Sequence, residues 1–166
     1  MVPCLYCESV AGDLPQAVVW AERSVVALLD WRQAAPGHVL VLPREHLSAE
    51  EVFARPVGAD LLAATVRVAA AVREAFAVEA VQMGGILFPG GGGPLRTSGR
   101  LREADPAAVE TAEDGHFHLH VLPRRRGADV ARIYPFGDGI TSLPRLEEMA
   151  RRIRAVMEAP DARGIL

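Results

Sequence analysis

Short apolar runs predict three strands in the first part of the chain. Residues 17 to 20 and residues 25 to 29 are two β-rich runs separated by a polar turn, which is the pattern of a β-hairpin. After the turn signal Ala35-Pro36-Gly37, a third apolar run at residues 38 to 42 predicts a mostly buried strand. We interpret His38, which opens this run, as a structural residue rather than a ligand.

Helical periodicity follows in two segments. Residues 59 to 76 carry apolar side chains at helical spacing and predict an amphipathic helix that covers a sheet with one face: Leu62, Val66, Ala69 and Phe76. Residues 142 to 158 predict a C-terminal helix, with a cap at Thr141 or Ser142, Pro144 in the first turn and an apolar stripe: Leu146, Met149, Ile153 and Val156.

Two further strands are expected at residues 83 to 88 and 116 to 123. Between them, residues 89 to 112 include four consecutive glycines and predict a flexible Gly-rich insertion.

The order of elements, several strands, one helix and then more strands, indicates an α+β fold with an antiparallel sheet. We expect a single domain over residues 1–166, because the chain is too short for two full domains.

Three of the five histidines alternate with apolar residues inside the last of these strands. His116, His118 and His120 therefore face one side of the strand. An imidazole can transfer a proton, attack as a nucleophile or bind a metal near neutral pH. Histidines two residues apart on a strand stand about 7 Å apart. One metal therefore cannot easily bind all three, although two of them sharing a metal is an alternative to catalysis.

Composition and charge exclude several classes of function. The net charge of −3 and the absence of a sustained basic surface make nucleic acid an unexpected partner, with Arg124-Arg125-Arg126 as a small exception. All 18 basic residues are arginine, which excludes a Schiff-base lysine and a phosphate-binding loop of the Gly-Lys-Ser/Thr type. No run approaches about 18 apolar residues, and the N-terminal segment lacks the pattern of a signal peptide. We therefore expect a cytoplasmic protein and no membrane partner.

Two cysteines near the N-terminus add a candidate metal or redox pair. Cys4 and Cys7 are spaced as Cys-x-x-Cys, which in a reducing compartment favours metal or redox chemistry over a structural disulfide. Zinc takes about four Cys or His ligands in a tetrahedron, and His46 and His116 are the natural completion. The alternative is a pair of free thiols with His46 on the surface.

Several motifs, taken in order, resemble one known family. The run from His116 to Arg124, the segment from Cys4 to Pro15, the run Ala27-Leu-Leu-Asp30 and the segment from Pro36 to His46 are similar to the histidine-triad (HIT) family of nucleotide hydrolases and transferases. The likeness covers roughly residues 4 to 55 and 114 to 124. It implies a HIT-like fold in which an antiparallel sheet packs with one central and one C-terminal helix, and a homodimer.

The resemblance also implies roles for individual residues. His118 would be the nucleophile that attacks the α-phosphorus of a small nucleotide, of the nucleoside phosphoramidate type, and His120 would contact the phosphate or assist the leaving group. Asp30 would bind the ribose hydroxyls. Tyr6, Leu28 and Trp31 fall at positions similar to the family's base pocket, although Leu28 is equally well explained as ordinary core. Some bacterial HIT proteins bind zinc with Cys and His ligands of this kind. The resemblance therefore implies a structural zinc in this chain, bound by Cys4, Cys7, His46 and His116.

The chain departs from the family pattern just before the triad. Ala112 and Glu113 stand where related proteins carry a Gln and a Ser, and Gly84-Gly85 lies where an Asn is usual. A glutamate there would repel a phosphate unless it is turned away. Two alternatives therefore stay open: a non-catalytic nucleotide- and zinc-binding protein, and a dinucleoside polyphosphate hydrolase.

Overall fold

A central antiparallel sheet organises the protein in a computed structural model that describes residues 4–85, 115–125 and 140–159. Within these ranges the sheet has five strands in the order β1-β2-β3-β5-β4, and every pair of neighbours runs antiparallel. The strands are β1 (Val18–Ala21), β2 (Val25–Leu29), β3 (Val39–Pro43), β4 (Ala80–Gly84) and β5 (Leu119–Arg124). The predicted α+β class and antiparallel sheet are confirmed.

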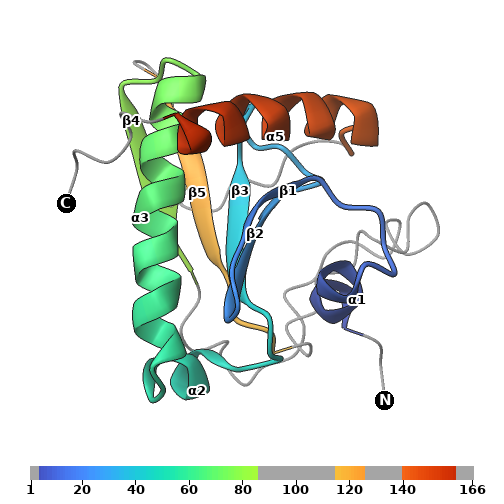
Figure 1. The fold of residues 1–166 in the computed structure, drawn as a ribbon, viewed down its shortest axis with the longest axis vertical. Coiled ribbons are helices and arrows are strands. Elements are labelled where there is room, and N and C mark those ends of the chain that lie inside the picture. The colour runs from blue at the N-terminus through green and yellow to red at the C-terminus, as the bar shows by residue number, and fades with distance from the viewer. Residues whose placement is uncertain (1–3, 86–114, 126–139, 160–166) are drawn as a thin grey trace.

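In the described part of the chain, two long helices cover one face of this sheet. In Figure 1, α3 (Val57–Ala75) runs alongside the strands and α5 (Leu143–Glu158) crosses one end of them. Alternate residues of β2, β3 and β5 point into this layer, where they meet the buried side chains of both helices: Ala27, Leu29, Val41, Val121, Leu61, Val68, Val72, Leu146 and Ile153. Full burial of one such Val, Leu or Ile side chain stabilises the fold by about 1.5–3 kcal/mol.

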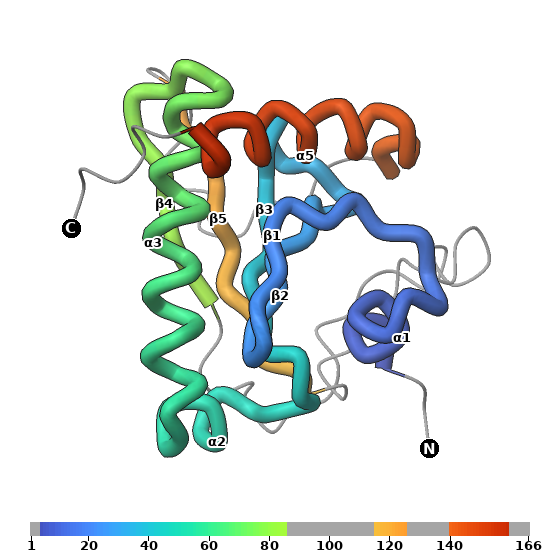
Figure 2. Tube along the Cα trace, in the orientation of Figure 1, coloured from blue at the N-terminus to red at the C-terminus, as the bar shows by residue number. Residues whose placement is uncertain are grey.

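The opposite face of the sheet carries a smaller apolar cluster beneath a short helix, α1 (Leu5–Ala11). Cys4 and Tyr6 pack there on four strand residues: Val26, Leu28, Leu40 and Leu42. In Figure 2, α1 and α3 lie on opposite sides of the strands, whereas α5 crosses the upper end of the strands. Successive strand residues point to opposite faces, so the residues that alternate with the main core are the ones that meet α1. This face is where the histidines lie.

The predicted core face of the central helix is partly wrong. Leu62 and Val66 are 49% and 44% exposed, whereas their neighbours Leu61, Thr65 and Val68 are buried. Phe76 is buried as expected. The helix carries apolar residues on two adjacent stripes, so periodicity alone did not distinguish the stripe that meets the sheet from the one that remains exposed.

The predicted fourth strand is displaced. It was expected at residues 83 to 88, but β4 spans Ala80–Gly84 because its register with β5 pairs Ala80 with Arg124 and Gly84 with His120. The strand begins in the more polar residues before the apolar run, whose later residues lie outside the described ranges. The expected Gly-rich insertion at residues 89 to 112 also lies outside them.

Two short helices were not predicted. One is α1, and the other is α2 (Ala49–Phe53), which begins at Ser48 with a capping box. The Ser48 side chain accepts from the Glu51 N–H, and the Glu51 carboxylate accepts from the Ser48 N–H. These two hydrogen bonds lower the pKa of Glu51.

In the described part of the chain, no helix combines the length and apolar character needed to cross a membrane.

Candidate active site and metal-ligand cluster

The histidine row lies at the start of β5, on the face that α1 covers. His120 pairs with Leu40 of β3, and cross-strand partners share a face. His116 and His118 precede the first residue of β5, but their segment keeps the alternation, since Phe117 between them enters the main core. The three histidines nevertheless have three different surroundings.

The middle histidine, His118, is oriented by the backbone. Its Nδ1 lies 3.1 Å from the carbonyl oxygen of His116, which can only accept a hydrogen bond, so Nδ1 carries the proton in the neutral ring. Nε2 then carries the lone pair and lies 3.4 Å from the Tyr6 hydroxyl. A neutral imidazole with one nitrogen fixed as a donor has its nucleophilic nitrogen defined by geometry.

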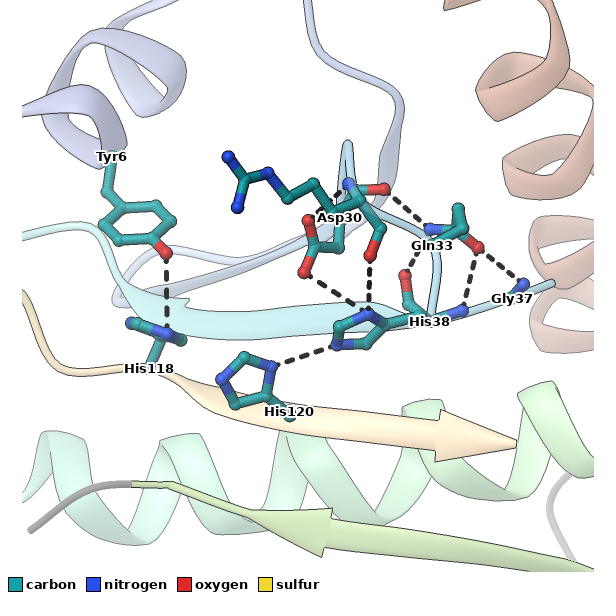
Figure 3. A network of polar contacts seen from close by, with 8 residues as sticks. Tyr6, Asp30, Gln33, Gly37, His38, His118 and His120 are labelled. Carbon is teal, nitrogen blue, oxygen red and sulfur yellow. Dashed lines mark hydrogen bonds and ion pairs between the residues drawn. The ribbon is translucent and has the colours of Figure 1, made fainter. Parts of the chain in front are cut away.

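The third histidine, His120, is linked to a buried second histidine and a carboxylate. His120 Nδ1 lies 3.0 Å from His38 Nε2, and His38 Nδ1 lies 3.3 Å from Asp30 Oδ2 (Figure 3). His38 Nδ1 is also 3.3 Å from the Arg32 carbonyl oxygen. Both neighbours of Nδ1 accept, so Nδ1 is a donor. One proton therefore lies between His38 and His120, and the Asp30 carboxylate would stabilise a positive charge on this pair when it takes up another proton.

The loop between β2 and β3 is fixed around this pair. The Gln33 amide donates to the carbonyl oxygens of Asp30 and His38, and its own oxygen accepts from the N–H groups of Gly37 and His38. Gly37 has φ +94°, and a Cβ there would lie 2.5 Å from the Phe76 ring. Glycine is thus required for both backbone conformation and space immediately before His38.

The structure adds a role to His38, which the sequence indicates only as a structural residue. It is completely buried, and its ring stacks on His120 with centroids 5.2 Å apart. A fourth histidine therefore belongs to the constellation. The signal in the sequence was its place two residues before Leu40, at the start of the run that forms β3. This signal indicates a contact with His120 only once β3 is known to lie beside β5.

The residues assigned to base binding are divided between the two faces. Tyr6 and Leu28 share the small cluster under α1, and Leu28 is almost completely buried there. Trp31 instead packs against the main core. Asp30 lies beside His38 and accepts a hydrogen bond from the Arg32 N–H through Oδ1 at 2.8 Å.

The first histidine, His116, joins the two cysteines and His46. Its Nδ1 lies 3.6 Å from Cys4 Sγ and 3.5 Å from Cys7 Sγ, and Cys7 Sγ lies 3.3 Å from His46 Nδ1. All four ligand atoms lie within 4.8 Å of one another. A sulfur and a nitrogen bound to one tetrahedral zinc are separated by about 3.6 Å, given metal–ligand distances of about 2.3 and 2.1 Å. The cluster therefore has the donor set and dimensions of a structural zinc site.

The surroundings of His116 fix the tautomer and the charge state that a metal ligand needs. Its Nε2 donates to the Pro43 carbonyl oxygen at 2.9 Å, which leaves Nδ1 as the nitrogen that points to the sulfurs. Burial lowers the pKa of His116 to about 4, although the hydrogen bond to Pro43 opposes this shift. The ring is therefore neutral at neutral pH, which is the form that binds a metal, and a backbone carbonyl on the other nitrogen is a common support for such a ligand.

The fold and the two clusters define a histidine-triad protein, and comparison with known proteins agrees. A model of the HIT domain matches residues 11–93. An uncharacterised HIT-like protein of Mycobacterium tuberculosis is 31% identical over 126 residues, which are 76% of this chain and 74% of that protein. The chain therefore belongs to the HIT family.

Two further relatives are informative. The adenosine 5'-monophosphoramidase of Schizosaccharomyces pombe is 27% identical over 122 residues, which are 73% of this chain and 74% of that enzyme. The crystal structure of a Zn-bound histidine triad family protein from Mycobacterium smegmatis has a TM-score of 0.63 and 26% identity, over 93% of this chain and 92% of that chain. Both resemble this chain over most of their length.

Proposed function

We propose that this protein is a nucleotide hydrolase or nucleotidyl transferase that cleaves at the α-phosphorus of a small nucleotide, of the nucleoside phosphoramidate type. The observation that carries the proposal is the orientation of His118, whose Nδ1 faces the His116 carbonyl at 3.1 Å and whose Nε2 carries the lone pair. The similarity to a phosphoramidase supports the choice of substrate. In the described part of the chain, His118 has the arrangement of an oriented nucleophile with an acid–base pair close by.

The first step forms a bond between His118 Nε2 and phosphorus and breaks the bond from phosphorus to the leaving amine. The leaving nitrogen takes a proton from His120, which regains one through its 3.0 Å contact with His38. Asp30 lies 3.3 Å from His38 and stabilises the positive charge that this pair holds before the transfer. The product of this step is a nucleotidyl group on His118.

In the second step water attacks the same phosphorus and the bond to His118 Nε2 breaks. The water proton passes to His120, so the pair with His38 returns to its starting state. The imidazole of His118 leaves as a neutral ring because its Nδ1 has kept its proton, which it donates to the His116 carbonyl oxygen in a hydrogen bond. Water gives hydrolysis and a nucleoside monophosphate, whereas a different acceptor would give nucleotidyl transfer.

Substrate binding is assigned to the residues around Asp30. Both oxygens of a carboxylate accept hydrogen bonds, which suits two ribose hydroxyls, and Asp30 lies at the site through its contacts with the Arg32 N–H and His38. Tyr6, Leu28 and Trp31 remain our proposal for the base pocket. Leu28 lies so deep in the small cluster that we expect it to support Tyr6 more than to contact the base.

We propose that Cys4, Cys7, His46 and His116 hold a structural zinc ion. The separations of 3.3–3.6 Å between sulfur and nitrogen atoms support this proposal, as does the likeness to a Zn-bound relative. The ion would supply a fixed junction between α1, the segment after β3 and the segment before β5. No step of the proposed reaction passes through it.

We also propose a homodimer built on α3 and β4. The exposed apolar side chains Leu62 and Val66 lie one turn apart on α3, and Met83 on β4 is 43% exposed. β4 is the outer strand of the sheet on that side within the described residues. A second copy of the chain would cover this apolar surface and pair the strand edge. A cytoplasmic location stays a prediction from the sequence.

Hydrolysis assays test the proposed activity. We expect the purified protein to release AMP from adenosine phosphoramidate and His118→Ala to lose this activity while keeping the wild-type melting temperature. Rates on phosphoramidates and diadenosine polyphosphates, measured side by side, distinguish the two substrate classes. Tight binding of AMP or GMP without turnover on either class would contradict the enzyme and favour a nucleotide-binding protein.

A further inference from the structure

We propose that the Tyr6 hydroxyl holds His118 in the resting protein and donates a hydrogen bond to the attacked phosphoryl group during nucleotidyl transfer. The proposal rests on the proposed function, since it assigns a second task to a residue at the nucleophile. Tyr6 is not a member of the histidine row, and it reaches His118 from α1, on the opposite side of the site from β5 (Figure 3).

The direction of the contact follows from the ring of His118. Because His118 Nδ1 is held as a donor by the His116 carbonyl, Nε2 of the neutral ring can only accept. The Tyr6 hydroxyl, 3.4 Å from Nε2, is therefore the donor. The two rings also lie against each other, with centroids 4.7 Å apart and planes inclined by 44°. At this separation the hydrogen bond is weak, so a substrate can displace it.

The position of Tyr6 is set by the fold. The side chain is only 8% exposed and packs with Leu28 and Leu40 on the sheet. In sequence it lies between Cys4 and Cys7, whose sulfurs approach His116, the residue two positions before His118. The same cluster thus fixes both the helix that carries Tyr6 and the segment that carries His118. A tyrosine placed in this way contacts the nucleophile without a loop having to move.

The chemistry requires the hydroxyl to change partner. Formation of the bond from Nε2 to phosphorus uses the lone pair that accepts from Tyr6, so Nε2 stops being an acceptor as the bond forms. The nearest atoms that gain negative charge are the non-bridging phosphoryl oxygens, and the hydroxyl can donate to one of them. Ahead of the triad, Ala112 and Glu113 supply neither an amide nor a hydroxyl side chain. Tyr6 would provide a neutral donor that does not come from this segment.

Replacement of Tyr6 by phenylalanine separates the two effects, because the ring stays and only the hydroxyl is lost. In the metal-loaded protein without substrate, we expect Tyr6→Phe to change the Nε2 resonance of His118 in histidine-detected ¹H–¹⁵N spectra. Carbethoxylation of His118 by diethyl pyrocarbonate should become several-fold faster. Turnover should move in the opposite direction, with kcat about 10-fold lower and KM little changed, which is below the 100- to 1,000-fold effect of a strong oxyanion donor.

Ser9→Ala is the matched control. It removes a hydroxyl from the same helix, where Ser9 Oγ donates to the Leu5 carbonyl oxygen and accepts from the Gln16 side-chain amide. We expect this variant to keep the wild-type resonance, carbethoxylation rate and kcat. A Tyr6→Phe protein with the wild-type values of all three would overturn the proposal, as would equal changes in Ser9→Ala. If the wild type has no turnover, the proposed function fails, while the resonance and carbethoxylation still report whether Tyr6 holds His118.

Discussion

His38 illustrates what the sequence can and cannot reveal at the scale of a residue. Alternation places His116, His118 and His120 on one face, and the structure places the side chains of His118 and His120 as neighbours, with ring centroids 4.9 Å apart. The same alternation cannot reveal a partner on another strand. His38 looked like an ordinary first residue of a buried strand until the register of β3 with β5 brought it to His120. Contacts of this kind depend on strand order, which no local pattern encodes.

Two replacements of His38 test its link to His120. An asparagine amide can occupy the place of Nδ1 and keep the contact with Asp30, whereas a glutamine amide can reach the place of Nε2 and keep the contact with His120. Neither amide can pass on a proton, but glutamine still orients His120. We therefore expect His38→Asn to lower kcat by about 100-fold, the lower range for a lost proton-transfer group, and His38→Gln to lose somewhat less because His120 keeps its orientation. Phosphoramidate hydrolysis measures both. Wild-type turnover in a folded His38→Asn protein would show that the pair does not transfer the proton.

At the scale of elements, the sequence predicted strands better than it predicted contacts between layers. Short apolar runs bounded by turns located β1, β2 and β3 because a buried strand needs little more than such a run. The face of α3 was less certain, since Leu61 and Leu62 are both apolar and only packing decides which is buried. The helix α1 was missed because it is a short segment held by its side-chain contacts with the sheet rather than by an apolar period of its own.

The turn before β3 gives a prediction at this scale. Gly37 and Gly12 both have φ near +90°, at +94° and +88°, but a Cβ meets the Phe76 ring at 2.5 Å only in the first case. We expect Gly12→Ala to lower the free energy of unfolding by about 1 kcal/mol, for the left-handed backbone alone. Gly37→Ala should lower the free energy of unfolding by about 1–3 kcal/mol more than Gly12→Ala does, because its Cβ also overpacks against the Phe76 ring.

Urea denaturation of the two glycine variants provides the measurement. Gly37→Ala should also reduce turnover, because its clash lies immediately before His38, whereas Gly12→Ala should not. Equal losses of stability in the two variants would mean that Phe76 moves aside without cost. Packing against Phe76 would then not be what holds the turn before His38 in place.

At the scale of the whole molecule, the metal cluster joins parts of the chain that are distant in sequence. Cys4, immediately before α1, and Cys7, within α1, meet His46 after β3 and His116 before β5. The set was predictable because a Cys-x-x-Cys pair needs two further ligands and the chain has few histidines. The zinc ion it implies should therefore stabilise the folded chain.

Removal of the metal tests this role. Zinc at about 100 times its Kd stabilises the folded state by about 2.7 kcal/mol, which for a chain of this size corresponds to a Tm higher by roughly 5–10 °C. We expect a chelator to lower the Tm of the wild type by about this amount and to leave a Cys4→Ser, Cys7→Ser protein unchanged. Metal analysis near zero zinc per chain, together with a Tm that does not respond to chelator, would contradict the assignment.

The exposed stripe on α3 gives a second prediction for the whole molecule. If a second copy covers Leu62 and Val66, a charge there will cost the dimer the burial of its apolar surface and leave an unpaired carboxylate in the interface. We expect Leu62→Glu and Val66→Glu to shift the protein from dimer to monomer in sedimentation velocity. Arg151→Glu places the same carboxylate on the exposed face of α5, with a larger change in net charge, and as a control it should stay dimeric. A monomeric wild type would contradict the proposed interface.

The most direct test of the whole account is the identification of the residue that becomes covalently modified during turnover. The protein is mixed with adenosine phosphoramidate, quenched within a turnover in alkali, which preserves a phosphorus–nitrogen bond, and digested for mass spectrometry. We predict an adenylyl group on the peptide that contains the triad, located on His118 by fragmentation and lost in His118→Ala. An adenylyl group on another residue, or hydrolysis that proceeds with no modified histidine, would contradict the assignment of His118 as the nucleophile.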